Sequence, residues 1–106
     1  MAPDDAEALE LLGRAAVEAG DATEAREAFG GLHRLQPTRP AALIGLALVA
    51  ARLDNDQPSA IEALRQAVAM DSGLDLTGLL LRPEWTALAS DESFVNALNG
   101  LFSELR

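Results

Sequence analysis

Residues 9–16 read Leu-Glu-Leu-Leu-Gly-Arg-Ala-Ala, and Gly20, Ala25, Phe29 and Pro37 follow at wider intervals. The apolar residues of the first run recur at three- and four-residue steps, which is the spacing of one face of an α-helix. Gly20 is a typical residue for ending a helix, and Pro37 stops a second one. Residues 6–37 therefore predict two helices joined by a short turn.

The same pattern returns about 34 residues later. Four positions of the first helix match the third at an offset of 34 residues: Leu9 and Leu43, Leu12 and Leu46, Gly13 and Ala47, Ala16 and Ala50. The second and fourth helices match at an offset of 35, and one extra residue in the turn at 54–58 explains the change. A helix–turn–helix unit of this period predicts an all-α fold, a short α-solenoid with repeats at about 6–37 and 40–72.

The repeated residues resemble the tetratricopeptide repeat, in which an apolar residue, a Leu-Gly pair and spaced Ala, Phe and Pro recur. The first repeat carries these as Leu12, Gly13, Ala25, Phe29 and Pro37. Small residues let the paired helices approach closely, and the phenyl ring fills the gap that they leave.

Polar and proline residues mark where the helices begin. Asp21 or Thr23 is expected to cap the second helix, and Thr38 the third, with residues 39–40 in its first turn. Pro58 is expected to open the fourth helix, since the first turn needs no backbone N–H from it.

Residues 73–106 are predicted to cover the open end of the second repeat. Helices are expected at about 75–81, 84–89 and 91–105, the last capped by Ser90 or Asp91. Similar tandem segments commonly close tetratricopeptide arrays in bacterial proteins. We expect Trp85 and Phe94 to be core residues of this C-terminal cap.

Composition excludes several classes of function. The chain has 106 residues, which predicts a single domain over 1–106, and its net charge is −9. Such acidity disfavours nucleic acid and anionic membranes as partners. No apolar run reaches the roughly 20 residues of a membrane span, and the acidic N-terminus resembles no secretory signal, so we expect a cytoplasmic location.

The chain offers little material for catalysis. It has no Cys and one His, His33, so neither a cysteine nucleophile nor a multi-histidine metal site is expected. The acidic clusters near both ends of the chain are interpreted as solvated helix surface. We therefore predict no enzymatic activity, no metal and no cofactor.

The resemblance implies that the first helix of each repeat lines a concave groove for a peptide or partner helix. The expected groove residues are Glu7, Glu10, Arg14, Val17 and Glu18 from the first repeat, and Ala41, Ile44, Leu48, Ala51 and Arg52 from the second. An amphipathic partner would place apolar groups on Ile44 and Leu48 and basic groups toward Glu7 and Glu10. Burial of Ile44 and Leu48 under the C-terminal helices is the open alternative.

Charge is distributed unevenly, since residues 31–53 contain three Arg and no acid between two acidic ends. The predicted function is non-catalytic protein–protein interaction, as an adaptor or scaffold. The alternatives are a small chaperone for a secretion substrate and a domain that associates with a second copy of itself.

Overall fold

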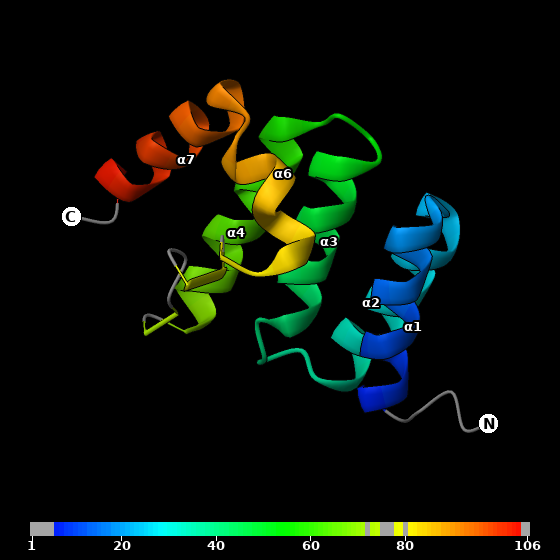
Figure 1. Ribbon diagram of the computed structural model, residues 1–106. Coiled ribbons are helices and arrows are strands. Elements are labelled where there is room, and N and C mark those ends of the chain that lie inside the picture. The colour runs from blue at the N-terminus through cyan, green and yellow to red at the C-terminus, as the bar shows by residue number, and fades with distance from the viewer. Residues whose placement is uncertain (1–5, 72, 75–77, 80, 105–106) are drawn as a thin grey trace.

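The structure is a computed structural model that describes residues 6–71, 73–74, 78–79 and 81–104. Over these residues it is helical and contains no strand (Figure 1). The elements in chain order are α1 (Ala6–Ala19), α2 (Ala22–Leu35), α3 (Ala41–Arg52), α4 (Gln57–Met70), the 3₁₀ turn η1 (Pro83–Trp85), α6 (Thr86–Ala89) and α7 (Glu92–Glu104). The predicted all-α class is confirmed.

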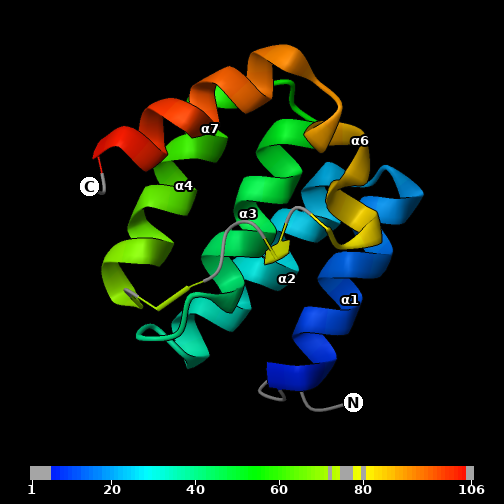
Figure 2. The same ribbon diagram turned by 60° about the vertical axis from the view of Figure 1, so that its left-hand side comes forward.

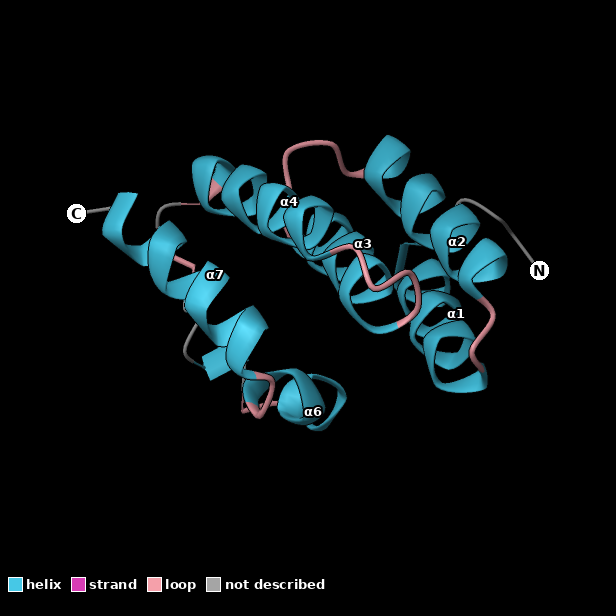
Figure 3. Ribbon diagram, turned by 90° about the horizontal axis from the view of Figure 1, so that it is seen from above, coloured by secondary structure: helices cyan, strands magenta, loops and turns pink. Residues whose placement is uncertain are grey.

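Two helical hairpins stack side by side. The helix α1 packs on α2 and α3 on α4, while α3 also contacts both helices of the first hairpin. Seen from above, α7 continues the row beyond α4, and α6 lies on the side of α1 and α3 (Figure 3). This arrangement is the short solenoid that the internal repeat predicts.

Local signals end and begin the helices at several of the expected residues. Gly20 has φ +77°, a left-handed conformation that suits glycine and ends α1. The Asp21 side chain caps α2, because its Oδ1 accepts a hydrogen bond from the Glu24 N–H at 3.0 Å. Asp91 likewise accepts from the Phe94 N–H at 3.3 Å at the start of α7. Asp21 and Asp91 are thus the caps among the predicted pairs.

The start of α3 differs from the prediction. The helix begins at Ala41, its N-cap is Pro40 and no side chain caps it, so Thr38 is not the cap. The Arg39 N–H instead donates to the Gln36 carbonyl at 3.1 Å, which closes a turn before the helix. The reason is steric, since a residue that precedes proline is pushed out of the helical region.

The Phe29 ring of α2 fills the contact between α1 and α3. It is 2 % exposed, and two glycines face it from opposite helices. A Cβ atom added at Gly13 would lie 2.6 Å from the ring, and one at Gly45 would lie 2.3 Å from it. The predicted pairing of Gly13 with Phe29 is confirmed, and Gly45 is a second glycine on the same ring.

The C-terminal segment packs against the second hairpin (Figure 2). Of the helix predicted at 75–81, residues 75–77 and 80 lie outside the described residues, and 78–79 are helical. The helix predicted at 84–89 is present as η1 followed by α6. Trp85 is 1 % and Phe94 0 % exposed, and their ring centroids lie 6.2 Å apart. Both are core residues, as predicted, and α7 contacts α4.

Candidate functional site

A cavity of about 320 Å³ opens between the first helices of the two hairpins and the C-terminal segment. Its walls come from α1, α2, the turn before α3, α3 itself and residues around η1. The lining residues are Glu10, Arg14, Phe29, Arg39, Pro40, Ala41, Ile44, Gly45, Leu48, Leu74, Arg82, Glu84 and Trp85. Four of the seven residues predicted for the groove, Glu10, Arg14, Ile44 and Leu48, therefore meet here.

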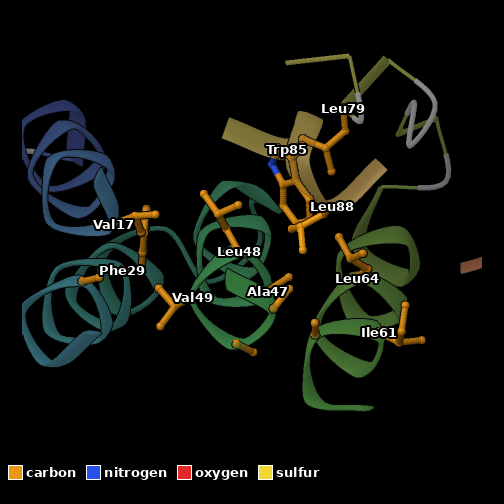
Figure 4. Packing of buried hydrophobic residues seen from close by; sticks show 14 of the residues in the cluster. Val17, Phe29, Ala47, Leu48, Val49, Ile61, Leu64, Leu79, Trp85 and Leu88 are labelled. Carbon is orange, nitrogen blue, oxygen red and sulfur yellow. The ribbon is translucent and has the colours of Figure 1, made fainter. Parts of the chain in front are cut away.

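The apolar part of the cavity is made by α3 and the C-terminal segment. Leu48 is 3 % exposed, and in Figure 4 the Trp85 indole points from η1 toward the side of α3 that carries Leu48. Ile44, one turn earlier, is only half-buried. The structure thus divides the two residues, placing Leu48 in the core beneath the C-terminal segment and leaving part of Ile44 accessible to a ligand.

A second cavity of about 340 Å³ adjoins the first. It is lined by Ile44, Leu74, Gly78, Leu79 and Arg82, of which Ile44, Leu74 and Arg82 also line the first cavity. The shared residues make one longer depression that runs along α3 toward the C-terminal segment. We call the two cavities together the α3 groove.

The charged residues of the α3 groove differ in how they are paired. Arg14 Nη2 lies 3.3 Å from Glu10 Oε1, one turn away on α1, and both side chains are well exposed. Arg39 and Arg82 are exposed and form no ion pair with another described residue. The groove therefore holds three guanidinium groups and two carboxylates, Glu10 and Glu84.

Arg52 has a different position from the one predicted, because it does not line the groove. Its Nη1 donates to Glu18 Oε1 at 3.0 Å and to the Glu84 carbonyl at 3.2 Å. One side chain thereby joins α3 to α1 and to η1. Its geometry is that of a residue that fastens the C-terminal segment over the first helices.

Val17 and Glu7 also lie outside the lining of the groove. Val17 is 2 % exposed and belongs to the core, on the side of α1 that faces α2 and α3 (Figure 4). Glu7 is exposed on the first turn of α1. The helical pattern placed Val17 on the groove side, but the crossing of α3 over α1 turns that position inward.

Three lining residues were missed by the sequence analysis: Arg39, Leu74 and Arg82. Arg39 belongs to the acid-free segment at 31–53, so its charge could have drawn attention to it. Leu74 and Arg82 lie some thirty residues or more beyond α3 in the chain and reach Ile44 only through the fold. Helical periodicity contains no information on that approach.

Other features of the described residues point to no further chemistry. No group of three or more His, Cys, Asp or Glu in this part of the chain could hold a metal ion. His33, in the last turn of α2, has a buried Nδ1 without a hydrogen-bond partner among the described residues. None of the helices described is long and apolar enough to cross a membrane.

A family model described as Tetratricopeptide repeat matches residues 1–40 and, in a second and overlapping match, residues 11–75. The chain belongs to the tetratricopeptide repeat family. No curated protein and no solved structure gave a significant match. Repeats of this family generally mediate protein–protein interaction and are typically non-catalytic.

The two tetratricopeptide hairpins are α1–α2 and α3–α4, so the matches cover both of them. The α3 groove lies on the face formed by the first helix of each hairpin, α1 and α3. The second wall of the groove comes from residues 74–85, beyond the matched region. Any ligand of the groove would therefore touch both the repeats and the C-terminal segment.

Proposed function

We propose that the chain is a non-catalytic interaction module that binds a peptide or a partner helix in the α3 groove. The observation that carries the proposal is the half-buried Ile44 at the junction of the two cavities. A concave site with apolar walls and a few polar groups at its edge is the usual form of a ligand site.

The geometry supports Ile44 as the anchor in preference to Leu48. Leu48 already lies in the core against the C-terminal segment, so it has little surface left to offer. Ile44 packs against the same core from its edge and faces both cavities together with Leu74. An apolar side chain of the partner would cover Ile44 and Leu74 and remove their surfaces from water.

A random-peptide display library, selected on the immobilised full chain, tests the proposal. We expect the wild-type protein to enrich a set of peptides that the Ile44→Asp variant fails to bind, because a carboxylate would stand where the apolar anchor docks. Leu46→Asp is the matched control, since Leu46 is also half-buried on α3 but lines neither cavity.

Circular dichroism and urea unfolding of both variants show whether they keep their helices. The proposal fails if the wild-type protein enriches no peptide over Ile44→Asp. It fails equally if Leu46→Asp, with the same helix content as Ile44→Asp, abolishes binding to the same extent.

A chaperone for a secretion substrate would bind its client in the same groove, so this experiment tests the site of both the adaptor and the chaperone. The two functions differ in the partner rather than in the groove. The proposal retains the cytoplasmic location and a protein partner, because the net charge of −9 disfavours nucleic acid and anionic membranes.

Self-association is a second candidate, supported by the outer face of α1. Leu11 is 58 % and Leu12 39 % exposed, the former more than any other described leucine except Leu81. A second copy of the chain could cover both leucines. Sedimentation across a concentration series should show a dimer that Leu11→Glu dissociates, and a wild-type monomer at high concentration excludes it.

A further inference from the structure

The arginines of the described chain fall into two groups. Four of them form ion pairs, namely Arg14 with Glu10, Arg26 with Asp54, Arg52 with Glu18 and Arg65 with Glu62. Arg34, Arg39 and Arg82 form none with any described residue. Two of these three, Arg39 and Arg82, line the α3 groove.

Unpaired cations are unexpected in this chain, because it carries 17 Asp and Glu against eight Arg. Carboxylates are available on every side, and most of the described arginines have one. The segment that contains Arg39, residues 31–53, nevertheless has no acid at all. The groove thus keeps positive groups without their own counter-charge in a protein whose overall field is negative.

The acids of the groove do not cancel this charge. Glu10 is already engaged by Arg14 at 3.3 Å, which leaves Glu84 against both Arg39 and Arg82. The lining therefore has a net charge of +1. This also changes the partner expected from the sequence, since basic groups directed toward Glu10 would have to displace Arg14.

The unpaired arginines and the apolar anchor belong to the same surface. Arg82 lines both cavities with Ile44 and Leu74, and Arg39 lines the first cavity beside Pro40 at the start of α3. A partner side chain seated on Ile44 would thus have a guanidinium group available on the α3 side and another on the C-terminal side. Guanidinium groups bind carboxylates through two parallel N–H donors.

We infer that the α3 groove binds a protein segment in which an apolar side chain is flanked by Asp or Glu, and that Arg39 and Arg82 determine this specificity. The inference rests on the proposed function, because it names the chemistry of the ligand of that groove. Solvent-exposed pairs of this kind change affinity by roughly two- to fivefold for each arginine.

The overall charge of the protein makes the test sharp. A field of net charge −9 attracts basic peptides wherever no local group intervenes, so a non-specific surface would enrich Lys and Arg. The inference predicts the opposite enrichment at the positions next to the apolar anchor.

The same peptide library is selected on the full-length wild type, on the double variant Arg39→Gln/Arg82→Gln and on Arg34→Gln. Arg34 is the matched control, since it is exposed and unpaired but lines neither cavity. We expect Asp and Glu to be enriched beside the anchor by the wild type and by Arg34→Gln, and not by the double variant.

One enriched peptide and its counterpart with Gln in place of the acids are then titrated by fluorescence anisotropy. The acidic peptide should bind the wild type several-fold more tightly than the Gln peptide, and the double variant should bind the two equally. The preference should shrink as salt is raised, because exposed charges are screened over about 10 Å at 0.1 M salt.

The outcomes separate the inference from the proposed function. Peptides that depend on Ile44 but are neutral or basic overturn the inference and leave the groove as a binding site. An acidic preference that survives in the double variant also overturns it. Failure to enrich any peptide over Ile44→Asp overturns the proposed function.

Discussion

The helices α1 and α3 occupy the same place in successive repeats, yet their surroundings differ. At an offset of 34 residues, Leu11 of α1 corresponds to Gly45 of α3, and Arg14 corresponds to Leu48. Leu11 is 58 % exposed, whereas Gly45 is buried against the Phe29 ring. Arg14 lies in solvent, whereas Leu48 is 3 % exposed near Trp85.

The difference follows from the number of neighbours. In the described structure α3 has α2 on one side and α4 with the C-terminal segment on the other, while α1 contacts α2 and α3. A helix with neighbours on both sides needs small residues where a ring enters and apolar residues where it is covered. The repeat thus sets the position of a helix, and its neighbours set the size of the residue at each position.

The largest expected effect comes from uncovering α3. Replacing Trp85 by Ala should lower the free energy of unfolding by about 3–5 kcal/mol, because it removes a fully buried indole that packs with Phe94 in the core. Urea unfolding measures this loss. Leu81→Ala is the control, since Leu81 is 78 % exposed and its loss should cost less than about 0.5 kcal/mol. Equal effects of the two changes would contradict the placement of Trp85.

A smaller effect is expected where α3 meets the Phe29 ring. Gly45→Ala should destabilise by about 1–3 kcal/mol, because its Cβ would lie 2.3 Å from a buried aromatic atom. In the control Gly100→Ala, the new methyl group meets no atom within 4 Å, so the helical preference of Ala should stabilise by about 0.5–1 kcal/mol. Thermal or urea unfolding that shifts both variants in the same direction would contradict this account of α3.

The smallest effect concerns the start of α4, the partner of α3. Hydrogen bonds from the Ser59 hydroxyl, at 2.7 Å, and the Ser59 N–H, at 3.2 Å, lower the pKa of Asp56 below its ordinary 3.8. A lowered folded-state pKa stabilises the protein above the unfolded value, and the contribution is lost as pH falls through the folded value. Asp56→Ala should therefore lower the urea midpoint at neutral pH, and progressively less as the solution is acidified below 3.8.

The control for this prediction is Ser59→Ala, in which the larger of the two causes is absent. The NMR titration of Asp56 should then move back toward 3.8. An unchanged titration would show that the Ser59 hydroxyl does not hold the carboxylate.

Much of the fold was predictable because its determinants are local. Gly20 ends α1 through a backbone conformation that glycine adopts readily, and Asp21 caps the next helix with its own side chain. The pairing of Gly13 with Phe29 followed from the family pattern, and both residues meet in the structure. The cap of α3 was predicted wrongly, since the constraint that Pro40 places on Arg39 outweighs the capping preference of Thr38.

The candidate site was less predictable, because it is assembled from distant parts of the chain. Glu10, Arg14, Ile44 and Leu48 were placed on one face by helical periodicity, and they do line one cavity. The inward position of Val17 depends on how α1 crosses its neighbours.

By itself, the sequence determined the helices, their order and the spacing of the two repeats, because helix periodicity, caps and small-residue contacts act within one repeat. Only the tertiary structure decided which repeat positions are open and which are covered. Arg52 illustrates this, since it became a link between Glu18 and the Glu84 carbonyl instead of a groove residue. The approach of residues 74–85 to α3 buries Leu48, leaves Ile44 at the edge and brings Arg82 into the groove. The physical reason is that burial depends on all neighbours of a side chain, and those neighbours come from parts of the chain that a local pattern does not relate.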